Sequence, residues 1–267
     1  MNLNGRVAIV IGASGDIGSA TVRAFAAAGA HVVLAAPESE IHLLDQVAAE
    51  AERCGVRALV VPTDVTIRAE IDCLVATTLD AFETIDVLAN VAGRGSSPAL
   101  CDDSDDDLRR TVEVNLLGCA RTIHAVLPVM KMQRRGSIVN VGSIAGEVAV
   151  LGIYSATKFG LRGLTDTVRR EARSCNIGVT LVEPGFVRSK MSHAMGDGLP
   201  SPDIVARAIL RAAQRPRRRV IVPAYWALPI YAGKLFPGLF DRIFGNARIQ
   251  NRLNRDTRAD RSQRVAP

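Results

Sequence analysis

The stretch RVAIVIGASGDIG, residues 6–18, decides the fold because an apolar run ends there in a glycine-rich loop. Residues 17–28 continue it with a helical pattern. A strand that enters a helix through such a loop presents backbone N–H groups and the positive end of the helix dipole to an anion. Gly12, Gly15 and Gly18 are spaced GxxGxxG, which favours a site for a dinucleotide pyrophosphate over a plain tight turn.

Six further apolar runs alternate with helical patterns along the chain. Strands that are apolar throughout and separated by helices indicate a parallel sheet covered on both faces. We therefore predict an α/β fold, a single doubly wound Rossmann domain with a seven-stranded parallel sheet, over residues 1–222. The further expected strands are 31–36, 57–61, 86–90, 137–141, 178–183 and 219–222, and the further expected helices are 41–53, 67–82, 104–130, 153–174 and 202–213.

The composition is that of an ordinary globular protein. Of the 267 residues, 48% are hydrophobic and 22% are charged, which excludes a disordered chain, a collagen-like repeat and a small disulfide scaffold. The apolar runs are too short to cross a bilayer, and the N-terminus lacks the pattern of a signal peptide. Five scattered cysteines without a CxxC pair indicate reduced thiols, so we expect a cytoplasmic protein without a metal site.

The net charge of +6 is unevenly distributed. Residues 215–267 hold 12 Lys and Arg against 3 Asp and Glu, whereas residues 1–214 hold 21 against 24. The basic character therefore belongs to the C-terminal part and not to the expected Rossmann domain. No groove-reading motif accompanies it, so we expect no nucleic acid partner.

A tyrosine and a lysine open the expected helix 153–174. Tyr154 and Lys158, four residues apart, share one helix face. A phenol has an ordinary pKa near 10, and a neighbouring ammonium favours its ionised form. Such a pair can exchange a proton with a substrate oxygen while a cofactor carries hydride, although YxxxK by itself also fits a surface pair on an amphipathic helix.

Several other polar or turn-forming residues follow the expected strands. In open α/β sheets, ligands bind at the carboxyl ends of the strands. Residues at or just after these ends are Asp64-Val65, Asn90-Val91-Ala92-Gly93, Ser143 and Pro184-Gly185, and Asn115 lies within the expected helix 104–130.

Taken in order, these motifs resemble the classical short-chain dehydrogenase/reductase family from about residue 4 to residue 222. The resemblance implies that Tyr154 is the general acid/base and that Lys158 binds the nicotinamide ribose and lowers the pKa of the tyrosine. It implies that Ser143 bonds the substrate oxygen and that Asn115 holds a water in a proton relay. The implied catalytic residues are thus Asn115, Ser143, Tyr154 and Lys158.

The resemblance also implies a nicotinamide cofactor. The expected cofactor-binding residues are Gly12, Ser14, Gly15, Ile17, Gly18, Asp64, Val65, Asn90, Ala92, Gly93, Tyr154, Lys158, Pro184, Gly185, Val187 and Ser189. Asp16 stands where a middle glycine is usual, and the second strand ends in Ala35-Ala36-Pro37, without an acidic or basic residue to select the cofactor. The choice between NAD(H) and NADP(H) stays open, although Asp16 and Glu38 would repel a 2′-phosphate.

The segment after the last expected strand is an aromatic C-terminal extension, residues 223–247, followed by a basic tail, residues 248–267, that we expect to be flexible. Phe236, Phe240 and Phe244 are spaced i, i+4, i+8, and Tyr231, Leu235 and Leu239 form a neighbouring stripe. Residues 225–244 have three interpretations: packing on the domain or on a second copy, closure of a lipophilic substrate pocket, or peripheral contact with a membrane.

The sequence hypothesis is an NAD(P)-dependent oxidoreductase acting on a secondary alcohol or ketone, which the Met-bearing loop 186–200 and the aromatic extension suggest is lipophilic. The alternative is a nucleotide-binding member of the family without significant turnover, serving as a scaffold or sensor. An epimerase or dehydratase of the extended type is disfavoured by the short chain after the sixth strand. The resemblance further implies a homodimer or homotetramer.

Overall fold

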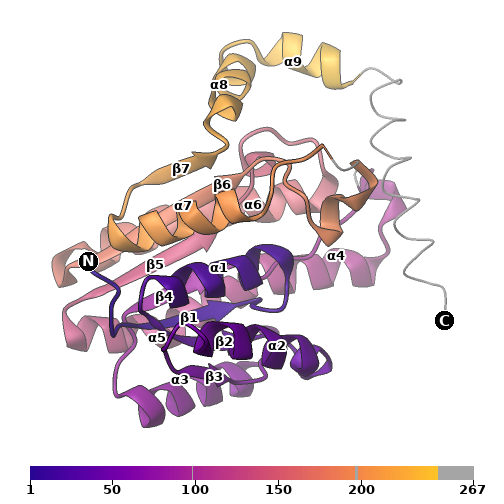
Figure 1. Ribbon diagram of the computed structural model, residues 1–267. Helices are drawn as coiled ribbons and strands as arrows, with labels where there is room; N and C mark the ends of the chain where they lie inside the picture. The colour runs from indigo at the N-terminus through magenta and orange to yellow at the C-terminus, as the bar shows by residue number, and fades with distance from the viewer. Residues whose placement is uncertain (98, 196–197, 246–267) are drawn as a thin grey trace.

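The computed structural model describes residues 1–97, 99–195 and 198–245, and the expected tail 248–267 lies outside this part of the chain. Its centre is a sheet of seven parallel strands in the order β3-β2-β1-β4-β5-β6-β7 (Figure 1). This confirms the predicted doubly wound Rossmann fold. The strands are β1 (Val7–Ile11), β2 (His31–Ala35), β3 (Ala58–Val60), β4 (Val87–Asn90), β5 (Gly136–Val141), β6 (Ile177–Pro184) and β7 (Arg219–Val222).

Helices cover both faces of the sheet (Figure 1). One apolar core lies between the sheet and α1, α2 and α7, and a second lies between the sheet and α3, α5 and α6. The helices of the described residues are α1 (Asp16–Ala27), α2 (Ile41–Glu52), α3 (Arg68–Phe82), α4 (Asp105–Val112), α5 (Cys119–Gln133), α6 (Gly152–Ala172), α7 (Asp203–Gln214), α8 (Ala227–Leu235) and α9 (Pro237–Phe244).

Strand order reverses at β1, which pairs with β2 on one side and with β4 on the other. Ile11 is in register with Ala35 of β2 and with Asn90 of β4, so the three carboxyl ends lie level. The chain leaves these ends in opposite directions, and a crevice at such a reversal is where open α/β sheets bind ligands.

The expected helix 104–130 is interrupted. Between α4 and α5 the chain forms a π-helical turn, Glu113–Gly118, which contains Asn115. A Cβ on Gly118 would lie 2.6 Å from a methyl group of Val65, so only glycine lets this turn approach the loop after β3 so closely. Extra turns of this kind occur where a helix must re-aim a side chain, often at a functional site.

The extension forms two helices, so the expected aromatic and leucine stripes do not run along one continuous helix. The backbone of Phe236 is not helical, with φ −127° and ψ 62°, and Pro237 begins α9. A proline inside a helix removes a hydrogen bond and clashes with the preceding turn, so α8 ends before it. Phe240 and Phe244 stack on each other at 4.2 Å between ring centroids, while Phe236 lies in the break.

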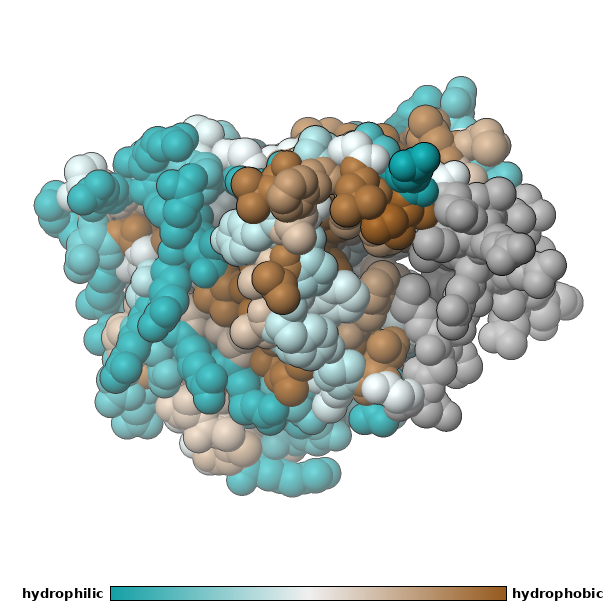
Figure 2. Space-filling view, turned by 90° about the horizontal axis from the view of Figure 1, so that it is seen from above, coloured by the Kyte–Doolittle hydropathy of each residue, from teal (hydrophilic) through white to brown (hydrophobic). Residues whose placement is uncertain are grey.

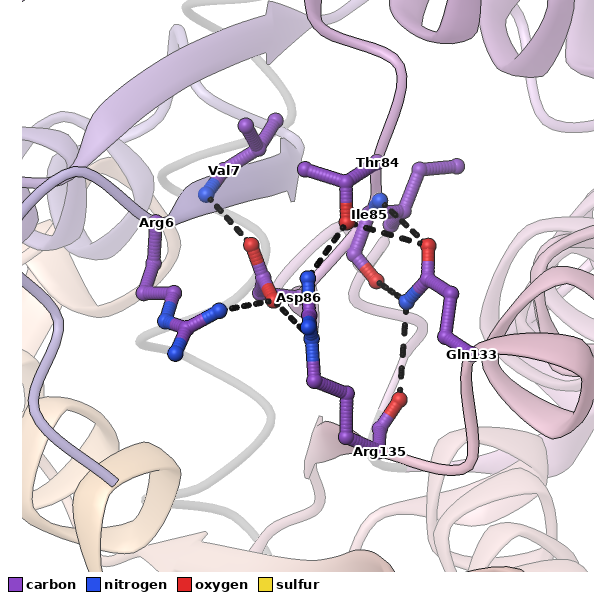
Figure 3. A network of polar contacts seen from close by, with 7 residues as sticks. All are labelled: Arg6, Val7, Thr84, Ile85, Asp86, Gln133 and Arg135. Atoms are coloured by element: carbon purple, nitrogen blue, oxygen red, sulfur yellow. Dashed lines mark hydrogen bonds and ion pairs between the residues drawn. The ribbon is translucent and has the colours of Figure 1, made fainter.

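A buried carboxylate joins the strands at the amino edge of the sheet, opposite the crevice at the strand reversal. Asp86, 1% exposed, accepts hydrogen bonds from the backbone of Val7 at 3.1 Å, from Arg6 at 3.3 Å and from Arg135 at 3.1 Å (Figure 3). Gln133 closes the same network by accepting from the backbone N–H of Ile85 and donating to its carbonyl (Figure 3). The network therefore joins the amino ends of β1, β4 and β5.

Replacing Asp86 with alanine is expected to lower the free energy of unfolding by about 2 kcal/mol, because it leaves the Val7 N–H and two arginines without their acceptor. Urea unfolding checks this. Asp80→Ala, at an exposed position of α3, is the control and is expected to stay within about 0.5 kcal/mol of the unsubstituted chain. Equal effects of the two substitutions would contradict a structural role for the Asp86 network.

Candidate active site

Three of the four expected catalytic side chains meet at the start of α6. Ser143 follows β5 directly, and its side chain is hydrogen-bonded to that of Tyr154. The Lys158 ammonium lies 5.5 Å from the centre of the Tyr154 ring, one helical turn further along. The backbone N–H of Tyr154 donates to the hydroxyl of Ser96 at 3.1 Å, which fixes the first turn of the helix. The sequence contains no signal for this contribution of Ser96.

Burial raises the pKa of Tyr154 above its ordinary value, and the hydrogen bond with Ser143 opposes this only in part. The resemblance implied that Lys158 lowers the pKa of this tyrosine, and that contribution stays a prediction. Loss of hydration penalises the phenolate more than the hydrogen bond with Ser143 stabilises it. The neutral phenol is a proton donor, the form that can protonate a developing alkoxide.

Lys158 is an almost completely buried cation. Its side chain is 4% exposed, and its ammonium donates to the carbonyl of Val141 at 3.0 Å, where β5 ends. Burial lowers the pKa of Lys158 from 10.5 to about 8. Gly146 allows this arrangement, since a Cβ there would lie 2.9 Å from the backbone carbonyl of Lys158.

Asn115 joins the π-helical turn to the loop after β4. Its side-chain amide donates to the carbonyl of Arg94 at 2.8 Å and accepts from the Arg94 N–H at 2.7 Å. It also donates to the hydroxyl of Thr157 on α6 at 3.2 Å. A Cβ on Gly93 would lie 3.6 Å from both the Asn115 amide oxygen and the Lys158 ammonium, so Asn115 belongs to the same cluster.

The glycine loop forms a bare cradle at the strand reversal. Gly12 has φ +81°, and a Cβ on it would lie 2.7 Å from the backbone of Ala92 in the loop after β4. A Cβ on Gly18 would overlap the carbonyl oxygen of Gly12. Gly15 caps α1 in extended conformation, and Ile17 packs on the core below. The N–H groups of Gly12 and Gly15 donate to backbone carbonyls, and the missing side chains at the three glycines let a pyrophosphate approach the N-terminus of α1, so the residues present fit a dinucleotide.

Acidic side chains adjoin this cradle. Ser14 donates a hydrogen bond to Glu40, at the start of α2, so Glu40 rather than the expected Glu38 reaches the loop. Asp16 accepts from the backbone N–H of Lys190 at 2.7 Å and thereby joins the loop to the segment after β6.

Three more of the expected cofactor residues lie at this edge in structural roles. Asn90 donates to Asn140 at 2.9 Å and accepts from Thr122 at 2.7 Å beneath the cradle. Asp64 accepts from the backbone and hydroxyl of Thr66, both at 2.8 Å, which shapes the loop after β3. Val65 is buried against Gly118.

The turn after β6 is covered by the extension. Pro184 ends the strand, and the N–H of Gly185 donates to the carbonyl of Val222 at 2.7 Å. A Cβ on Gly185 would overlap the indole of Trp226, which also meets Phe186 edge to face at 5.7 Å. Val187 is buried, and Ser189 shares a 3.0 Å hydroxyl contact with Ser192.

A buried ion cluster, which sequence reasoning missed, holds the loop after Ser143. Glu147 pairs with Arg162 of α6 at 2.7 Å, with Arg219 of β7 at 3.0 Å and with Lys234 of α8. Arg219 also pairs with Glu183. The extension is thus attached by charge to the loop that carries Ser143.

Among the residues described, no group of three or more His, Cys, Asp and Glu side chains is placed to hold a metal ion.

Comparison with known proteins decides the family. The profile of the family described as short chain dehydrogenase matches residues 6–199. The chain belongs to the short-chain dehydrogenase/reductase family. Members of this family are oxidoreductases that use NAD(P)(H).

The similar proteins agree with this assignment. An uncharacterized oxidoreductase of Staphylococcus haemolyticus is 34% identical over 80% of this chain and 93% of its own length. A 3-oxoacyl-[acyl-carrier-protein] reductase of Synechocystis is 38% identical over 72% and 78%. A short-chain dehydrogenase/reductase of Burkholderia phymatum, crystallised with NAD, superposes with a TM-score of 0.81 at 24% identity over 90% of this chain and 96% of its own, which shows the shared fold.

The lowered pKa of Lys158 predicts a pH-dependent stability. Between its folded pKa of about 8 and its unfolded pKa of 10.5, the unfolded chain binds the proton and the folded chain does not. Below pH 8, burial of the protonated lysine therefore lowers the free energy of unfolding by its full amount. This destabilisation disappears as the pH rises towards 10.5.

Lys158→Met removes the titrating group. Between pH 7 and pH 10.5, the free energy of unfolding of the unsubstituted chain is expected to rise by about 3 kcal/mol relative to that of the variant. Urea unfolding over this range measures the shift. A difference that does not vary with pH would contradict a depressed pKa for Lys158.

Proposed function

We propose that this short-chain dehydrogenase/reductase transfers hydride between a nicotinamide cofactor and a secondary alcohol or ketone. The observation that carries the proposal is the cluster of Tyr154, Ser143 and Lys158 beside a glycine cradle at the strand reversal. In this proposal, the sixteen cofactor-binding residues inferred from the resemblance hold NAD(H) or NADP(H), which supplies or accepts the hydride when bound.

In the direction of reduction, the substrate oxygen accepts hydrogen bonds from Ser143 and Tyr154. Two donors at this oxygen stabilise the negative charge that develops as the carbonyl carbon is reduced. Tyr154 then transfers its proton to the same oxygen, and oxidation of the alcohol reverses these steps. The raised pKa of the Tyr154 phenol keeps the proton available until the substrate oxygen becomes basic.

Lys158 and Asn115 support this transfer. Protonated Lys158 stabilises the phenolate that remains when Tyr154 has given up its proton. Asn115 holds the loop after β4 next to Lys158, and the relay proposed for it requires a water between its side chain and the ammonium.

A lipophilic substrate suits the surroundings of the cluster. Phe186 and Trp226 form an aromatic contact over the turn after β6. Met191 lies against Gly95, in the loop after β4, and its flexible thioether suits an adaptable apolar wall. We further propose a cytoplasmic homodimer or homotetramer, for which Leu117 and Phe159 offer exposed apolar contacts on the helices of Asn115 and Tyr154.

The alternative is a member that binds nucleotide without useful turnover. The proximity of Ser143, Tyr154 and Lys158 beside the cradle speaks against it, because a scaffold or sensor does not need these three side chains together.

Tyr154→Phe tests the reaction directly. Removing the proton donor is expected to lower turnover of secondary alcohols or ketones roughly a hundredfold or more while the dissociation constant for cofactor stays the same. Tyr231→Phe, which removes the hydroxyl of an exposed tyrosine on α8, is the matched control and should keep full turnover. Turnover that survives in Tyr154→Phe would contradict the assigned acid/base.

We propose that NAD(H) is the preferred cofactor, because Glu40 adjoins the glycine loop and residues 35–40 contain no Lys or Arg to bind a 2′-phosphate. Titrations followed by nicotinamide fluorescence are expected to show NADH binding roughly tenfold tighter than NADPH. Glu40→Gln should tighten NADPH and leave NADH unchanged, whereas Glu52→Gln, at the exposed end of α2, should change neither. Tighter NADPH binding by the unsubstituted chain would contradict this preference.

A further inference from the structure

The extension has one side that is anchored to the domain. Trp226 packs on Gly185, Ile230 of α8 is 1% exposed, and Lys234 pairs with the buried Glu147. From these anchors α8 and α9 project beyond the end of β7, away from the layers of the Rossmann domain (Figure 1). The two helices therefore have a fixed inner side and a free outer side.

The outer side carries two apolar stripes with helical spacing. Leu228, Tyr231 and Leu235 are exposed at i, i+3 and i+7 along α8. Phe236, Leu239 and Ile243 repeat the same spacing across the helix break and along α9. Seen from above, apolar side chains gather over this part of the molecule (Figure 2). We call these six residues the apolar stripes.

Covering this outer side would remove a large apolar area from water, which is energetically favourable. Leu228 is 79% exposed and Leu235 is 74% exposed, and covering such side chains removes apolar area from water, which stabilises the covered state. Contiguous exposed apolar residues of this kind mark a surface that contacts a partner or a membrane.

The charge next to the apolar stripes favours one partner over another. By sequence, residues 236–267 contain seven arginines and three aspartates. A second copy that met the stripes face to face would bring the same positive charge, and like charges oppose such an interface. The headgroups of an anionic bilayer bring the opposite charge, and each arginine close to such a surface adds to the attraction.

We propose that the apolar stripes dock this protein on an anionic lipid surface, which the net positive charge of residues 236–267, read from the sequence, favours. The stripes enter the boundary between headgroups and acyl chains, with the aromatic rings of Tyr231 and Phe236 at the headgroup level. No helix of the described residues is both long and apolar enough to cross a bilayer, so the contact is peripheral. This inference goes beyond the proposed oxidoreductase function and does not depend on it.

The test is co-sedimentation of the full chain with vesicles, without cofactor or substrate. The unsubstituted chain is expected to bind vesicles of phosphatidylcholine with phosphatidylglycerol, to bind phosphatidylcholine alone much more weakly, and to lose affinity as the NaCl concentration rises. Leu228→Asp combined with Leu239→Asp is expected to weaken binding to the anionic vesicles roughly tenfold or more.

Met132→Asp is the matched control, since Met132 on α5 is also 79% exposed but lies outside the stripes. It should bind vesicles like the unsubstituted chain. Thermal unfolding of all three proteins establishes that each is folded.

Two results would overturn the proposal. One is vesicle binding that is absent in the unsubstituted chain or unaffected by the double substitution. The other is a double substitution that changes the oligomeric state, measured by light scattering, in a chain that does not bind vesicles, since the stripes would then join two copies. Neither measurement reads turnover, so failure here and failure of the proposed reaction are distinguishable.

Discussion

The reversal of strand order at β1 is the constraint on which the rest of the molecule depends. Because β1 pairs with both β2 and β4, the loops that leave these strands separate above the sheet. Gly12 and Ala92 approach each other at this point so closely that a side chain on Gly12 would not fit. The cradle, the cluster around Tyr154 and the turn at Gly185 are all positioned from this edge.

Each edge of the sheet holds a buried charged side chain, and the two charges differ in how many partners they have. At the amino edge, Asp86 has two arginines and a backbone N–H as partners, and the charge stabilises three strands at once. At the carboxyl edge, Lys158 has one backbone carbonyl as its partner, and burial shifts its pKa towards neutrality. A poorly compensated cation is unfavourable for folding but suits proton transfer, so the unfavourable group lies where chemistry is proposed.

Local sequence patterns were sufficient to predict the sheet, but they were not sufficient to predict the details of the site. The apolar runs around Ile9 and Val139 are readable because burial on both faces leaves an unbroken apolar sequence. The placement of Asn115 in a π-helical turn cannot be read from local patterns, and its side chain bonds to the backbone of Arg94, 21 residues away. The cluster around Glu147 joins four separate elements, and no spacing in the sequence brings them together. The break at Pro237, by contrast, follows from a local rule.

The contact between Trp226 and Gly185 gives the molecule a spectroscopic property. Trp226 is the sole tryptophan in the sequence, and its indole lies on the turn that follows β6. Indole emission depends on the polarity and motion of the surroundings, so its colour and intensity follow changes at this turn. The ring also touches Phe186 and belongs to the extension, which places one natural fluorophore between the crevice and the outer helices. Events on either side can thus be followed by light, without attaching a dye.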